Sequence, residues 1–152
     1  MTNRPMTDDE LITAARAAAL KAYAPYSRFS VGCAIESMEG EIVTGANMEN
    51  ACYRLGLCAE QSALTAAQHA FGLDKVARIA VAGGDGSGPE LAGSGSVTPC
   101  GGCRQALLEA AQLGGRDVEI LCASGDGTMV ERLMLSALIP HGFGPASLAD
   151  AG

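Results

Sequence analysis

Tryptophan is absent from the sequence, and the other aromatic residues amount to three tyrosines and three phenylalanines. Positive charge is also scarce, because 10 Lys and Arg stand against 17 Asp and Glu and give a formal net charge of -7. Such a chain cannot form the basic stripe that neutralises a phosphate backbone, so we expect no nucleic-acid partner. No apolar run approaches the roughly 20 residues that cross a bilayer, which argues against insertion in a membrane.

Histidine is nearly as rare, since only His69 and His141 occur and neither lies in a nucleophile–base pattern. This argues against hydrolases of the Ser-His or Cys-His type. The first ten residues are polar and acidic, unlike a secretory signal. We therefore expect a cytoplasmic protein whose six cysteines are reduced rather than joined in disulfides.

The periodicity of apolar residues predicts one domain, 1–152, that alternates strands and helices. Thr7 and Glu10 form a capping-box pattern at the start of the first helix. The order of elements implies a mixed α/β sheet with helices on its faces. The expected helices are 7–22, 61–71, 101–112 and 133–138, and the expected strands are 30–36, 41–47, 76–82, 118–123 and 128–132.

Three segments lack either period. Residues 48–57 are polar and irregular just before a cysteine, which favours a loop that forms binding surface. The Gly- and Ser-rich segment 83–97 is long for a connection, and is either mobile or a rim over the site. We interpret residues 146–152 as a low-complexity tail.

Two short cysteine motifs precede helical segments. The first is Cys58-Ala59-Glu60, and the second is Cys100-Gly101-Gly102-Cys103. Cysteines at helix N-termini favour the thiolate, and three thiolates leave one tetrahedral position on Zn2+ open, as catalytic zinc sites do. Glu60 could then approach a water molecule at that position without ligating the metal, and transfer its proton. A lone Cys-x-x-Cys would be weak evidence, but the added Cys-Ala-Glu favours catalysis.

With Pro99 and Arg104-Gln105 around the second motif, these residues resemble the cytidine deaminases, specifically the short three-cysteine homotetrameric kind. Zinc deaminases as a class use such a non-ligating Glu as general acid and base. The resemblance continues in residues 24–32, 47–53 and 140–145, and so spans nearly the whole chain. It implies a three-layer α-β-α fold with a mixed five-stranded sheet.

The resemblance also implies roles for particular residues. Cys58, Cys100 and Cys103 would ligate one Zn2+ per chain, and Glu60 would carry protons between water, the ring nitrogen N3 and the leaving amine of cytidine or deoxycytidine. Residues expected to bind the nucleoside are Asn47 and Glu49 at the sugar hydroxyls, Phe29 packing against it, the backbones of Ala59 and Thr98 at the base edge, and Phe143 in a neighbouring subunit's site.

Two positions depart from the family pattern. Three-cysteine members commonly have an arginine after the catalytic Glu to offset the thiolate charge, whereas this chain has Gln61. We hypothesise that Arg104, or donors at the helix N-termini, compensate instead. Arg54 stands in place of the usual proline, and nothing in the sequence explains it.

Other interpretations compete with this one. Cys33 and Cys122 fall in strand-like runs and are expected to be small buried hydrophobes, while the role of Cys52 is open. The aromatic and polar binding residues could instead be ordinary core or strand-end residues. At the level of function, the alternatives are a deaminase of a cytosine nucleoside antibiotic such as blasticidin S, a non-catalytic zinc module, and a redox protein that uses Cys100 and Cys103.

Overall fold

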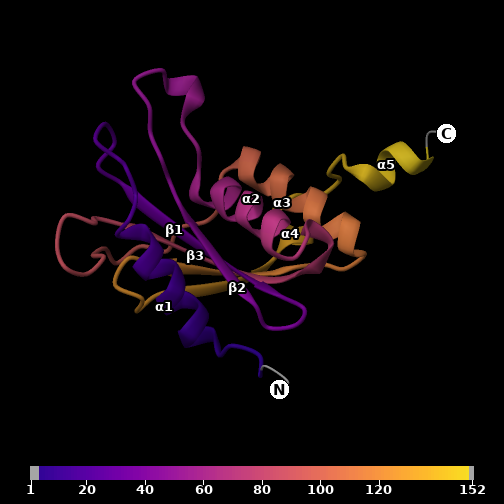
Figure 1. Ribbon diagram of the computed structural model, residues 1–152, viewed down its shortest axis with the longest axis horizontal. Helices are drawn as coiled ribbons and strands as arrows, with labels where there is room; N and C mark the ends of the chain where they lie inside the picture. The colour runs from indigo at the N-terminus through magenta and orange to yellow at the C-terminus, as the bar shows by residue number, and fades with distance from the viewer. Residues whose placement is uncertain (1–3, 151–152) are drawn as a thin grey trace.

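In the computed structural model, which describes residues 4–150, five strands form one mixed sheet in the order β2-β1-β3-β4-β5 (Figure 1). Strands β3 and β4 run parallel, and the other three pairings are antiparallel. The predicted hairpin of β1 and β2 and the mixed five-stranded sheet are thus confirmed. The strands are β1 (Ser30–Ser37), β2 (Ile42–Ala46), β3 (Val76–Gly84), β4 (Glu119–Ser124) and β5 (Val130–Met134).

The predicted capping box is present at the start of α1, where Thr7 accepts from the Glu10 N–H and Glu10 accepts from the Thr7 N–H. The helix ends three residues earlier than expected, because Tyr23 leaves it to exchange backbone hydrogen bonds with Asn47 and Glu49. The terminal helix α5 was not expected. The described helices are α1 (Asp8–Ala19), α2 (Ala59–Ala70), α3 (Gly101–Gly114), α4 (Leu135–Leu138) and α5 (Pro145–Asp150), with 3₁₀ turns at Tyr53–Leu55 and Leu73–Lys75.

Helices cover both faces of the sheet, with α1 on one side and α2 and α3 on the other (Figure 1). Leu11, Ala15 and Ala19 of α1 pack on the first face of the sheet. The second face carries a larger core that includes Leu64, Leu107 and the strand residues between them. The three-layer α-β-α architecture is therefore confirmed. Cys33 and Cys122 are fully buried in this second core, as expected.

The parallel pair β3–β4 determines where the helices begin. Helix α2 leads into β3 and α3 leads into β4, so each helix runs back along the sheet to the start of the next strand. Both helix N-termini therefore lie at the edge where β3 and β4 end, which is the edge where α/β sheets usually bind ligands. Of the helices within residues 4–150, none is long and apolar enough to span a membrane.

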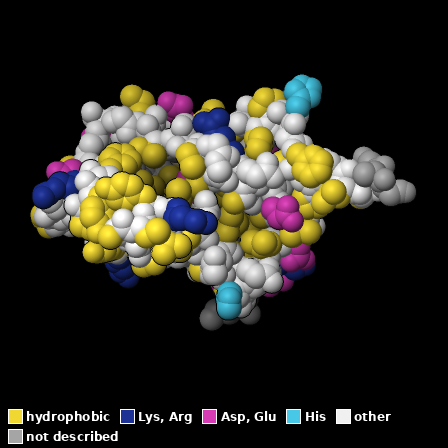
Figure 2. Space-filling model, turned by 90° about the horizontal axis from the view of Figure 1, so that it is seen from above, with side chains coloured by type: hydrophobic (Ala, Val, Ile, Leu, Met, Phe, Trp, Pro, Cys, Tyr) yellow, Lys and Arg dark blue, Asp and Glu magenta, His cyan; other side chains and the backbone are white. Residues whose placement is uncertain are grey.

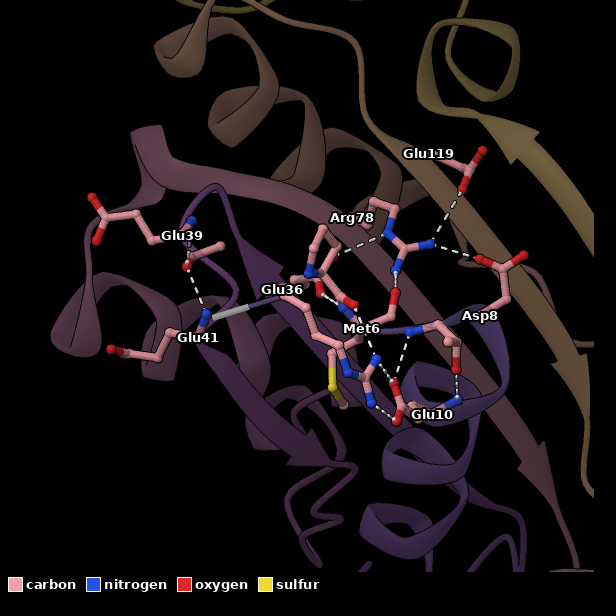
Figure 3. Close-up of polar contacts among 12 residues, drawn as sticks. Met6, Asp8, Glu10, Glu36, Glu39, Glu41, Arg78 and Glu119 are labelled. Carbon is pink, nitrogen blue, oxygen red and sulfur yellow. Dashed lines mark hydrogen bonds and ion pairs between the residues drawn. The ribbon is translucent and has the colours of Figure 1, made fainter. Parts of the chain in front are cut away.

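An ion-pair network occupies the opposite end of the sheet (Figure 3). The guanidinium of Arg78, near the start of β3, donates to Glu36 Oε1 at 3.1 Å, to Asp8 Oδ1 at 2.6 Å and to the Met6 carbonyl at 2.6 Å. Glu36 Oε2 accepts from the Met6 N–H at 2.6 Å. The side chain of Glu36 is only 5% exposed, so this network holds the segment before α1 against the sheet with a buried carboxylate.

Candidate active site

Three cysteines meet where α2 and α3 begin. Cys58 is the N-cap of α2, Cys100 is the N-cap of α3, and Cys103 lies in the first turn of α3. Their sulfur atoms all lie within 4.8 Å of one another. The two cysteine motifs, which are separated in the sequence by α2 and β3, are therefore brought together as predicted. Cys33 and Cys122 are buried elsewhere, and Cys52 is exposed.

The donor set fits a zinc ion. Zn–S bonds of about 2.3 Å in tetrahedral geometry place sulfurs about 3.8 Å apart, which the observed cluster allows with small adjustments. Thiolates are ligands that zinc prefers, and three of them leave one position for water or substrate. Cys58, Cys100 and Cys103 could thus hold a metal ion with an open position.

Donors around the sulfurs partly offset their charge. Hydrogen bonds from the backbone N–H groups of Cys103 and Gly102 lower the pKa of Cys100. The Gln61 side-chain amide lies 3.9 Å from Cys103 Sγ, within donating distance of a sulfur. Burial raises the pKa of Cys58 and of Cys103, a cost that a bound cation would overcome. Gln61, at the position where three-cysteine members of the resembled family commonly have arginine, therefore supplies an uncharged donor.

Arg104 is oriented differently from our hypothesis. Its Nε donates to the Pro99 carbonyl at 2.7 Å, and a terminal nitrogen donates to the Leu138 carbonyl at 3.0 Å. These bonds fix the segment that enters α3 and link it to the end of α4. Arg104 supports the position of Cys100 through the backbone, and the hydrogen bonds to the sulfurs come from Gln61 and from the start of α3.

Glu60 lies in the first turn of α2 and is 5% exposed. Burial raises the pKa of its carboxyl above the usual value of 4.5. A carboxyl with a raised pKa can both accept and return a proton near neutral pH. Glu60 also lines the same cavity as Cys58 and Cys100, so its carboxyl and the sulfur cluster face a common space.

The cavity has a volume of about 670 Å³. Residues of segment 48–57 line it; this segment projects from the rest of the molecule in Figure 1, and Figure 2, which views the molecule from that side, shows hydrophobic side chains gathered there. Segment 48–57 contributes six lining residues, and Val97, the last residue of segment 83–97, lines the cavity together with Thr98. The lining residues are Tyr26, Ser27, Phe29, Val31, Asn47, Met48, Glu49, Asn50, Tyr53, Gly56, Leu57, Cys58, Ala59, Glu60, Val97, Thr98 and Cys100.

Asn47 and Glu49 hold one wall of the cavity in place. Asn47 Oδ1 accepts from the Val31 N–H at 2.8 Å, and its Nδ2 donates to the Phe29 carbonyl at 2.9 Å. Glu49 Oε1 accepts from the N–H groups of Tyr26 and Ser27 at 2.9 and 3.1 Å. Hydrogen bonds from Ser27 lower the pKa of Glu49. A carboxylate has about four acceptor positions, so Glu49 retains capacity for a ligand hydroxyl.

The remaining sequence-predicted residues fall into two groups. Phe29, Ala59 and Thr98 line the cavity, where the expected substrate contacts place them. Phe143 does not line it; the residue is 62% exposed beyond α4, and its carbonyl accepts from Gln105 Nε2 at 2.6 Å. Arg54 is exposed in the 3₁₀ turn of segment 48–57, and nothing in the structure explains its replacement of proline.

Sequence reasoning missed several cavity residues. The rings of Tyr26 and Tyr53 meet edge to face, with centroids 5.9 Å apart, and join segment 48–57 to the segment before β1. Val31 and Val97 add further apolar surface to the cavity wall. The alternation of β1 could have placed Val31, but the other contacts join segments that are distant in sequence and carry no local signal.

Comparisons with known proteins agree with this geometry. Residues 5–114 match the family model described as the cytidine and deoxycytidylate deaminase zinc-binding region. A cytidine deaminase of Mycobacterium tuberculosis is 46% identical over 92 residues, a match that spans 60% of this chain and 62% of that protein. A cytidine deaminase of Halalkalibacterium halodurans is 37% identical over 129 residues, which are 85% of this chain and 88% of the relative.

Solved structures give the same result. The crystal structure of a cytidine deaminase from Burkholderia pseudomallei has a TM-score of 0.78 and 40% sequence identity, and covers 91% of this chain and 100% of that chain. The matched family region includes Cys58, Glu60, Cys100 and Cys103, which are the residues that the fold brings together. The chain therefore belongs to the cytidine and deoxycytidylate deaminase family.

Proposed function

We propose that this protein hydrolyses cytidine and deoxycytidine to uridine and deoxyuridine with release of ammonia, as an enzyme of pyrimidine salvage. The observation that carries the proposal is the buried Glu60, which lines one cavity with Cys58 and Cys100, two of the three clustered cysteines. Neither a structural zinc module nor a thiol redox pair needs a buried carboxyl at that place. Family membership supports the same reaction.

Cys58, Cys100 and Cys103 would hold one Zn2+ per chain. Bound zinc supplies a Lewis acid that lowers the pKa of a water molecule toward 7. Gln61 and the N–H groups at the start of α3 hold the sulfurs in orientation and moderate their charge. A metal held by these sulfurs would lie beside the cavity that Cys58 and Cys100 line.

Glu60 carries the protons of the reaction. Its carboxylate accepts a proton from the attacking water and delivers it to ring nitrogen N3, while the water oxygen forms a bond to C4. Glu60 then accepts the remaining proton of the hydroxyl group on C4 and delivers it to the exocyclic nitrogen. The C4–N bond breaks as the C4=O bond of uridine forms, and ammonia leaves. Burial raises the pKa of Glu60, which makes its carboxylate a better proton acceptor than an exposed one.

The cavity wall would bind the free nucleoside. Phe29 packs against it, the backbones of Ala59 and Thr98 contact the base edge, and Asn47 and Glu49 bind the sugar hydroxyls. Analogues that lack all of the sugar hydroxyls bound by Asn47 and Glu49 would leave these polar groups unpaired and bind poorly. A terminal phosphate would meet the carboxylate of Glu49, which favours nucleosides over nucleotides.

We extend the proposal to the assembly and its compartment. The exposed ring of Phe143 lies beyond its own chain's cavity, which supports a homotetramer in which Phe143 reaches a neighbouring subunit's site. The few basic residues argue against a nucleic-acid partner, and six free cysteines are typical of the reducing cytoplasm.

The decisive experiment follows the ultraviolet spectrum of cytidine with purified protein and measures zinc in the same sample. The proposal predicts conversion to uridine and about one zinc per chain. Zinc without turnover of cytidine or deoxycytidine would contradict it, and activity on a cytosine nucleoside antibiotic would then identify the alternative. Absence of both zinc and turnover would overturn the metal site itself.

The role of Glu60 is tested by Glu60→Gln, which should lower kcat by about 10²- to 10⁴-fold and leave zinc content unchanged. Glu109→Gln is a matched control, because Glu109 is an exposed residue of α3. Undiminished turnover in Glu60→Gln would require a different base.

A further inference from the structure

Gly83 lies behind the cavity wall near the end of β3. It is buried between Val31 of β1 and Ser124 of β4 in the register of the sheet. Two residues earlier, Val81 packs in the core beneath α2 and α3, so alternation directs Gly83 toward the same face. Gly83 is therefore on the side of the sheet that carries the active-site cavity.

The space at Gly83 is filled by two residues of the cavity wall. A β-carbon added there would lie 3.0 Å from Val97 Cγ2 and 3.2 Å from Cε1 and Cζ of the Phe29 ring. Real β-carbons rarely come so close to other heavy atoms, so any side chain at this position would displace the ring or the valine. Unlike Gly93 and Gly127, Gly83 does not have a positive φ, so the backbone itself would accept another residue. Glycine is needed at this position because the side chains of Val97 and Phe29 occupy the space that a β-carbon would take.

We infer that Gly83 is a positioning residue for substrate binding, because it lets the ring of Phe29 settle against the end of β3 and so sets the width of the cavity. This inference depends on the proposed role of Phe29 in packing against the nucleoside. Phe29 is held at its backbone by Asn47 Nδ2, but the residue is 43% exposed, so its side chain has open space to move into. A methyl group at Gly83 therefore pushes the ring toward the volume that the nucleoside occupies, and leaves the cysteines and Glu60 in place.

The test is Gly83→Ala, with steady-state kinetics on cytidine and deoxycytidine. We expect KM to rise about tenfold, the lower end of what one methylene group does in a binding pocket, because the ring can partly give way. Since the chemistry at Glu60 is untouched, kcat should change by less than about twofold. Zinc content should equal that of the parent. An unchanged KM in a folded, zinc-loaded variant would overturn the inference.

Gly95→Ala is the matched control. Gly95 belongs to the segment that leads to Val97, it does not have a positive φ, and a β-carbon there meets no described atom within 4 Å. The same substitution should leave KM and kcat at parental values. Equal increases of KM in both variants would assign the effect to the segment as a whole and would contradict a specific role of Gly83.

A double variant tests whether Gly83 acts through the ring. In a Phe29→Leu background, which shortens the crowded side chain, Gly83→Ala should raise KM by less than about twofold, because coupled residues are not additive. If Gly83→Ala alone folds poorly, Phe29→Leu should restore its zinc content and thermal midpoint. A tenfold effect that persists without the ring would refute the inference.

The proposed function and this inference can fail separately. If the parent protein does not convert cytidine, the proposed function has failed first. A crystal structure of Gly83→Ala still decides the geometry, because a ring of Phe29 that stays where it is in the parent would overturn the inference, and a displaced ring would support it.

Discussion

Replacing Arg78 by Met should destabilise the fold without touching the active site. The substitution removes the donors to Glu36, Asp8 and the Met6 carbonyl, and leaves the carboxylate of Glu36 with the Met6 N–H alone. Breaking a buried pair by removing one partner costs about 3 to 5 kcal/mol. Because the side chain of Arg78 is 21% exposed, we expect the lower end, about 3 kcal/mol.

For a domain of this size, a loss of about 3 kcal/mol lowers Tm by roughly 6 to 12 °C. The measurement is thermal unfolding by circular dichroism on zinc-saturated parent and variant. The control is Arg4→Met, which removes an exposed pair with Glu10 and should shift Tm little.

A double variant tests whether the buried charge of Glu36 causes the loss of stability. If an uncompensated buried charge causes the loss, adding Glu36→Gln to Arg78→Met should recover part of it. A shift in Tm no larger than that of Arg4→Met would refute the reasoning. So would a double variant that is less stable than Arg78→Met, because the buried charge would then not be the cause.

Three further predictions concern charge and metal. Gln61→Arg should change kcat/KM by less than about tenfold, because backbone N–H groups and the Gln61 amide already serve the sulfurs; a gain of tenfold or more would show that the thiolate charge is uncompensated. A hydrogen bond from Arg132, helped by Arg78, holds the pKa of Asp8 below 3.8. The unfolded chain therefore binds more protons at acid pH, so the stabilisation that Asp8 contributes is present above about pH 4 and is lost as the pH falls below it. Asp8→Asn should make Tm depend less on pH in this range, and an unchanged dependence would assign the acid loss to other groups. Removing zinc with a chelator should abolish turnover and lower Tm, with both restored by Zn2+ alone; full activity in metal-free protein would refute the zinc site.

The cysteine cluster was predictable because each half of it has a local cause. Cys58 and Cys100 stand directly before helical segments, and helix N-termini attract thiolates whatever the tertiary structure. The sequence pattern also predicted a strand after each of these helices. Because β3 and β4 run parallel, the N-termini of α2 and α3 lie at the same edge of the sheet. The capping box of α1 was readable for the same reason, since Thr7 and Glu10 are three residues apart.

What escaped prediction depends on contacts between distant segments. The amide of Asn47 is occupied by backbone groups of Phe29 and Val31, and Arg104 binds two carbonyls, neither of which a pattern of residue types can specify. Helix α5 was not expected, because most of its residues were interpreted as a low-complexity tail and six residues are too few to show a helical period.

The meeting of two helix starts at one sheet edge also links metal affinity to the integrity of the whole sheet. In the unfolded chain, Cys100 and Cys103 remain neighbours, but Cys58 lies far away along the chain, so only the folded protein offers all three sulfurs at once. A ligand that binds the folded state much better than the unfolded one stabilises it, and by the same linkage any loss of stability weakens the apparent affinity for that ligand. Replacing Arg78, at the far end of the sheet, would therefore weaken zinc retention under conditions in which the free energy of unfolding is small.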